Sequence, residues 1–167
     1  RSAGIEQTPE ARARFWKPFA HLEARAMLDA DSYAPLRSLG LCVQAYHLIP
    51  RIRELDALLT PELQVRVWES HPELSFMAMT DAPMTHSKRT PQGQQARIDA
   101  LRRVLNLDAE ALLRLWHAQR KSGVRIDDLL DACALAWSAL RHTQGRAELC
   151  LGVPEHDARG LLMAIRF

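Results

Sequence analysis

Hydrophobic residues recur at helical spacing along most of the chain. Between residues 44 and 59, six apolar residues lie three or four positions apart, with Pro50 predicting a kink or a late helix start. In the segment 91–105 the apolar positions face inward, and Arg97, Arg102 and Arg103 are expected outward. The pattern predicts five helices, with a sixth possible, over residues 44–59, 72–79, 91–105, 109–121 (capped by Asp108), 127–142 and, interrupted by Pro18, 11–28.

Two short apolar segments instead suggest strands. In the segment 64–69, Val65, Val67 and Glu69 alternate with other residues and would share one face of a strand. A carboxylate at the end of such a face is unusual unless it is paired, metal-bound or facing a cleft. The segment 161–167 is short and apolar enough to form a closing strand. We therefore expect an α/β chain that is mostly helical.

The helix expected from Asp127 begins with three carboxylates. Asp127, Asp128 and Asp131 fall on one side at about 100° per residue, opposite a stripe centred near Cys133 and Trp137. Beyond this turn the helix is apolar nearly all round, so its first turn is expected to line a polar cleft. In the alternative interpretation, these acids simply favour the positive end of the helix dipole.

Taken together, Glu69, Asp128 and Asp131 are candidate ligands and catalytic groups. Mg²⁺ or Mn²⁺ prefers oxygen ligands of this kind. A pair of such ions can activate a water molecule and stabilise the leaving oxygen of a phosphodiester. Two-metal sites usually also need an acid from a central strand, and no Asp or Glu of this sequence sits convincingly on one.

Positively charged residues are candidates for binding substrate phosphate. These are Lys88, Arg89 and Arg51, each with a solvated surface as the alternative. His71 could orient a ligand or a water molecule, or make a structural hydrogen bond. The net charge is +2, but residues 84–125 hold nine Lys and Arg against three Asp and Glu. This basic stretch could follow a nucleic-acid backbone or be the solvated faces of helices.

Composition narrows the class of protein. With 167 residues, the chain is expected to form a single domain, incomplete at its N-terminus because it begins with Arg1. No run approaches the roughly 18 apolar residues of a membrane span, and no signal peptide opens the chain. The three cysteines, Cys42, Cys133 and Cys150, lack metal-ligand spacing. They predict a reducing, cytoplasmic location.

Several motifs, in one order, resemble those of a single family. The family is a domain of unknown function, DUF429, described as predicted RNase H-like nucleases, and the resemblance covers roughly residues 29–167. The motifs are Gln44, Ile49-Pro50-Arg51-Ile52-Arg53-Glu54-Leu55-Asp56, Glu69-Ser70-His71-Pro72-Glu73-Leu74-Ser75-Phe76, Ser87-Lys88-Arg89-Thr90-Pro91-Gln92-Gly93, Asp127-Asp128-Leu129-Leu130-Asp131-Ala132 and Asp157-Ala158-Arg159-Gly160-Leu161.

The resemblance implies an RNase H-like mixed sheet flanked by helices, with carboxylates gathered at its centre. Glu69 would be the acid on the fourth strand, and Asp128 and Asp131 the acids of the last helix. Family members of this type begin with strands that carry an Asp-Gly motif. Residues 1–28 diverge from that pattern, so the N-terminal strands are expected to be absent or divergent.

Three functions are consistent with these observations. The first is a Mg²⁺- or Mn²⁺-dependent nuclease that hydrolyses DNA or RNA through Glu69, Asp128 and Asp131. The second is a non-catalytic RNase H-like binding or assembly module, and the third is an enzyme acting on a small phosphorylated ligand. A missing first strand would leave an unpaired sheet edge, which favours a homo-oligomer.

Overall fold

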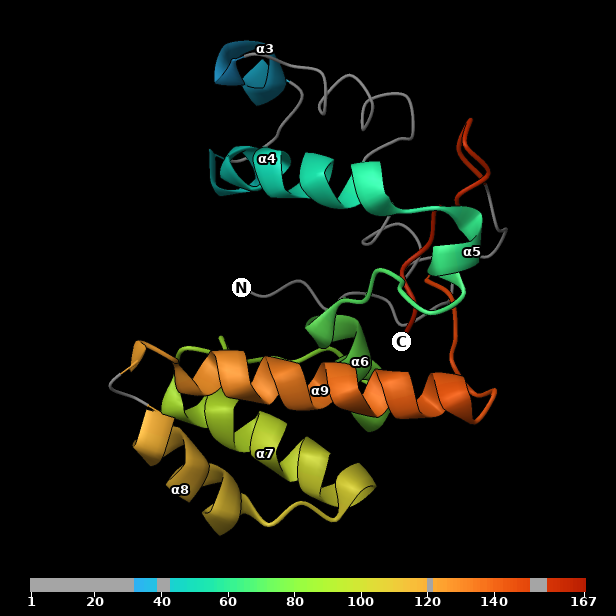
Figure 1. Cartoon of the computed structure of the whole chain (residues 1–167). Coiled ribbons are helices and arrows are strands. Elements are labelled where there is room, and N and C mark those ends of the chain that lie inside the picture. Colours follow the sequence, from blue (N-terminus) through green and yellow to red (C-terminus); the bar gives the residue numbers. More distant parts are fainter. Residues whose placement is uncertain (1–31, 39–42, 120–121, 151–155) are drawn as a thin grey trace. The chain divides into compact units, whose positions relative to one another are not determined.

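The structure is a computed structural model that describes residues 32–38, 43–119, 122–150 and 156–167. These residues fall into two compact units, which are drawn together in Figure 1. The larger unit contains Glu69–Cys150 and Ile165–Phe167, and the smaller one contains the described residues up to Trp68 and those between 156 and 164. The possible helix over residues 11–28, the divergent segment 1–28 and Cys42 lie outside the described residues.

The described part of the larger unit contains four helices. They are α6 (Pro72–Thr80), α7 (Pro91–Leu105), α8 (Ala109–Gln119) and α9 (Ile126–Thr143), and α6, α7 and α9 contact one another in pairs. Phe76, Leu101, Leu130 and Ala134 are fully buried where these helices meet. Each of these helices confirms a predicted segment, and each contributes buried residues to a shared core.

The helix starts follow from short polar signals. His71 and Thr90 each precede a proline that occupies the first turn of α6 or α7, and each accepts a hydrogen bond from a backbone N–H of that turn. The proline has no N–H to satisfy and its backbone angle suits the first turn. The Asp108 carboxylate accepts hydrogen bonds from two backbone N–H groups at the start of α8 (2.9 and 3.0 Å), as predicted.

The smaller unit contains α3 (Tyr33–Ser38), α4 (Val43–Leu58) and α5 (Pro61–Gln64). Helix α4 confirms the predicted helix over 44–59 and continues through Pro50. Arg159 ties the segment after residue 156 to the end of α4, because its guanidinium lies 2.9 Å from the Asp56 carboxylate and also donates to the backbone carbonyl of Leu59. None of the described helices of either unit is long and apolar enough to cross a membrane.

The predicted RNase H-like mixed sheet is wrong for the residues that the structure describes. Extended backbone pairs there only as isolated bridges, between Ser70 and Arg166, Leu149 and Arg166, and His156 and Leu162. The segment 64–69 does not form a strand, because Thr60 and Pro61 start α5 and a turn follows it. The predicted closing strand over 161–167 pairs only at single residues, and such short pairings cannot build a sheet.

Candidate functional site

The loop before α7 carries the cations of the candidate site. We call His86–Arg89 the basic loop. Thr90, the N-cap of α7, accepts a hydrogen bond from the Gly93 N–H (3.1 Å) and donates its hydroxyl to the Ser87 carbonyl (2.8 Å). A Cβ atom on Gly93 would lie 2.0 Å from that carbonyl oxygen. The basic loop therefore lies directly against the first turn of α7.

Arg97 ties the basic loop to two helices. Its Nη2 lies 2.6 and 2.9 Å from the two carboxylate oxygens of Glu73, in the first turn of α6. Its Nη1 donates to the carbonyl of His86 (3.2 Å) and to that of Gly93 (3.0 Å). The side chain is only 3% exposed and lies over the Phe76 ring. The prediction that Arg97 points outward is therefore wrong.

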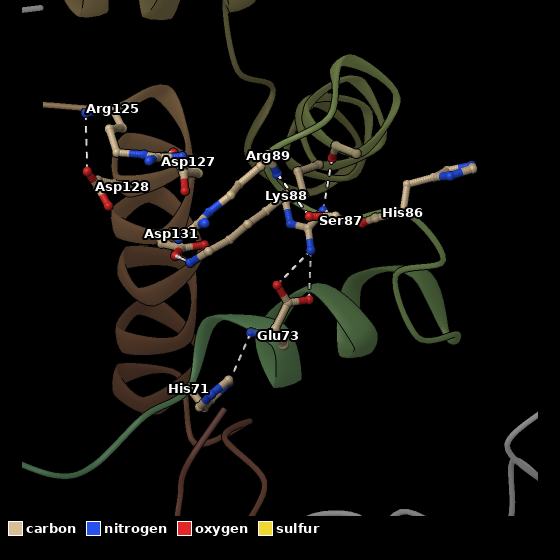
Figure 2. A network of polar contacts seen from close by, with 12 residues as sticks. His71, Glu73, His86, Ser87, Lys88, Arg89, Arg125, Asp127, Asp128 and Asp131 are labelled. Atoms are coloured by element: carbon tan, nitrogen blue, oxygen red, sulfur yellow. Dashed lines mark hydrogen bonds and ion pairs between the residues drawn. The ribbon is translucent and has the colours of Figure 1, made fainter. Parts of the chain in front are cut away.

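Lys88 leaves the basic loop and meets the acids of α9. Its Nζ lies 2.5 Å from Asp131 Oδ2, and the two side chains are 38% and 16% exposed. The other carboxylate oxygen of Asp131 is buried and has no hydrogen-bond partner in the described part of the chain. Figure 2 shows Lys88 and Arg89 extending toward the first turns of α9. A predicted phosphate-binding residue and a predicted catalytic acid are thus partners of each other.

The other two acids of α9 also have partners. Asp127 is buried, and its carboxylate lies 2.9 Å from Arg125 Nε. Desolvation alone would raise the pKa of Asp127, but the hydrogen bonds from Arg125 and from the backbone, together with the charges of Arg125 and Lys88, lower it. Asp128 accepts the backbone N–H of Arg125 (3.1 Å), which caps α9 (Figure 2). Asp128 is therefore a cap of α9, at the end of the helix where the dipole also favours a carboxylate.

His71 lies beside this group of charges and has a structural hydrogen bond. Its Nδ1 accepts the Glu73 N–H (3.3 Å), which caps α6 (Figure 2). Desolvation lowers the pKa of His71, and the charge of Lys88 acts in the same direction, whereas Glu73 and Asp131 oppose it. A lowered pKa agrees with the acceptor role of Nδ1, because only the neutral ring has a free nitrogen lone pair.

Glu69 and Arg51 make other contacts. The Glu69 backbone carbonyl accepts a hydrogen bond from the Arg166 N–H (2.9 Å). Desolvation raises the pKa of the Glu69 carboxyl group, although the residue as a whole is exposed. Arg51 is exposed on α4, in the smaller unit, where it pairs with Glu54 (2.8 Å).

The acids do not fit a Mg²⁺ or Mn²⁺ site in this arrangement. No group of three or more His, Cys, Asp or Glu side chains among the described residues is placed to hold a metal ion. Asp131 and Asp127 each face a cationic side chain instead, and Asp128 caps its own helix.

Three contributors to this region were missed by the sequence reasoning. Glu73, Arg97 and Gly93 were not identified as site residues, although Glu73 and Gly93 belong to the quoted motifs. The spacing of residues along α7 contained a signal that could have identified Gly93 and Arg97. Gly93, Arg97 and Leu101 lie four residues apart, so the three share one face of α7, and Leu101 belongs to the core.

Comparison with known proteins identifies a family. The family model described as "Protein of unknown function (DUF429)" matches residues 10–156, which is most of the chain. The chain therefore belongs to this family. No curated protein and no solved structure matches it.

Proposed function

We propose that this DUF429 member binds the phosphodiester backbone of nucleic acid through Lys88 and Arg89 without cleaving it. The observation that carries the proposal is the basic loop, whose backbone lies against the start of α7 and which carries two consecutive cations, both accessible to solvent. Lysine and arginine form charge-assisted hydrogen bonds with phosphate oxygens. A fixed loop limits the conformational entropy that ordering these side chains costs.

The partners of the acids favour binding over hydrolysis. The Lys88 ammonium lies 2.5 Å from Asp131, and Arg125 lies 2.9 Å from Asp127. Cleavage by the proposed carboxylates would need them free and gathered, whereas binding needs only cations that can exchange one anion for another. A phosphate arriving at the basic loop would compete with Asp131 for Lys88, and it would meet Arg89 on the same loop.

Replacing both cations is expected to weaken binding and to change its dependence on salt. Each lost phosphate contact should reduce the slope of log K against log salt by about 0.9 for duplex DNA and about 0.7 for single strands, so Lys88→Ala/Arg89→Ala should reduce it by about 1.8 and about 1.4. The measurement is fluorescence anisotropy of labelled single- and double-stranded oligonucleotides at several salt concentrations. Arg146→Ala, an exposed arginine beyond the other end of α9, is the control and should leave the slope unchanged.

Two outcomes would contradict the proposed binding site. One is a double variant whose affinity and salt slope match those of the unaltered chain. The other is a chain that binds neither DNA nor RNA at low salt, where electrostatic binding is strongest.

A second candidate function is hydrolysis of the same backbone. It is favoured by the buried oxygen of Asp131 that has no hydrogen-bond partner in the described part of the chain, because such an acceptor keeps its capacity to bind a ligand. It is also the activity that the resemblance of the motifs to RNase H-like nucleases implies.

Asp131→Asn separates the two functions. If the chain only binds, this change removes the negative charge beside Lys88 and should raise the affinity about threefold, which is the scale of a partly exposed ion pair. No sample should cleave the oligonucleotides in Mg²⁺ or Mn²⁺. If the unaltered chain cleaves the oligonucleotides and Asp131→Asn binds them without cleaving, the function is hydrolysis and not binding alone.

A further inference from the structure

We propose that Arg97 is the positioning residue of the basic loop, and that it sets where Lys88 and Arg89 meet phosphate. This inference rests on the proposed binding function. Arg97 is on α7, its ion-pair partner Glu73 is on α6, and its carbonyl partner His86 is in the basic loop. One buried guanidinium therefore connects the loop that carries the cations to both helices beside it.

The contacts of Arg97 require the shape of a guanidinium. Nη2 serves Glu73 while Nη1 serves the carbonyls of His86 and Gly93, so the two nitrogens face different segments at the same time. A lysine has one compact ammonium group and cannot span both sides. Nε has no hydrogen-bond partner among the described residues, so the described hydrogen bonds of the guanidinium all come from the two Nη groups.

The position of Arg97 determines the position of Lys88 through the backbone. His86 O is held by Arg97, and Ser87 O is held by Thr90, so the two residues before Lys88 are both fixed at their carbonyls. Lys88 then reaches Asp131 across 43 residues of sequence. Without the contact from Arg97 to the His86 carbonyl, the basic loop would no longer be connected to α6 through Glu73. The backbone positions of Lys88 and Arg89 would then no longer be fixed.

The test is a double-mutant cycle with nucleic-acid binding as the readout. Arg97→Lys is measured in the unaltered chain and in the Lys88→Ala/Arg89→Ala background, using the same labelled oligonucleotides at low salt. We expect Arg97→Lys to weaken binding about tenfold in the first case and by less than about twofold in the second, since the cations it positions are already gone. Arg103→Lys, on the exposed face of α7, is the matched control and should change neither value.

A merely structural role for Arg97 gives a different result. General weakening of the fold would lower the affinity by the same factor in both backgrounds, and that outcome would overturn the proposal. Glu73→Gln provides a second variant if Arg97→Lys does not fold, because it disturbs the guanidinium from the other side. It should show the same loss in the unaltered chain and the same lack of effect without Lys88 and Arg89.

Nuclear magnetic resonance distinguishes failure of this proposal from failure of the binding function. Arg97→Lys should shift the backbone amide signals of the basic loop and the carboxyl carbon signal of Asp131, with no nucleic acid present. Unchanged signals would overturn the positioning role whether or not the chain binds nucleic acid. Shifted signals in a chain that binds no oligonucleotide would overturn the binding function and leave Arg97 as the residue that positions the loop.

Discussion

Gly93→Ala is expected to lower the free energy of unfolding by about 2–3 kcal/mol, the scale of overpacking in a tightly packed site. The new Cβ would lie 2.0 Å from the Ser87 carbonyl oxygen and 2.7 Å from its carbon, and both are backbone atoms that cannot rotate away. In an unobstructed helix the same change would stabilise by about 1 kcal/mol, because alanine is the better helix former. The contact therefore reverses the usual sign of the substitution.

Urea unfolding followed by circular dichroism measures the effect of Gly93→Ala. Gln92→Ala is the control, since Gln92 is exposed in the same turn of α7 and should change stability by less than about 0.5 kcal/mol. The basic loop must also move, so Gly93→Ala should weaken oligonucleotide binding when the chain is folded. A variant as stable as the unaltered chain would show that the loop does not pack on α7 as described.

The helices could be predicted from sequence because their signals are local. Apolar residues at helical spacing located α7 and α9 to within one residue of their observed ends. The helix predicted over 44–59 stops just before Thr60-Pro61, and that pair begins the next helix. The same local signal explains the error over 64–69, because a cap followed by proline starts α5 and leaves too few extended residues for a strand.

The site was harder to predict because its contacts connect distant parts of the sequence. Glu73 and Arg97 are 24 residues apart, and Lys88 and Asp131 are 43 residues apart. The sequence offered Lys88 and Asp131 as separate candidates, yet it could not show that they form an ion pair with each other. The predicted acid Glu69 depended on a strand that does not form, so its alignment with Asp128 and Asp131 had no structural support.

Glu73→Ala is expected to destabilise the larger unit by about 3 kcal/mol, because removing one partner of a buried ion pair leaves the other charge uncompensated. The charge left behind is Arg97, whose side chain is 3% exposed, whereas that of Glu73 is 31% exposed. The carbonyls of His86 and Gly93 still accept hydrogen bonds from Arg97, but they supply no opposing charge.

Two further variants test whether the loss of stability comes from the broken buried ion pair or from the removal of any carboxylate. Glu110→Ala removes an acid from an exposed pair with Arg114 on α8 (3.6 Å) and should cost less than about 0.5 kcal/mol. Glu73→Leu/Arg97→Met removes both charges and should recover most of the stability lost in Glu73→Ala, since apolar replacement of a whole buried pair is often close to neutral. That double variant should remain folded but bind oligonucleotides weakly, because the basic loop loses the guanidinium that holds His86. A double variant that binds as tightly as the unaltered chain would mean that the position of Lys88 and Arg89 does not depend on Arg97.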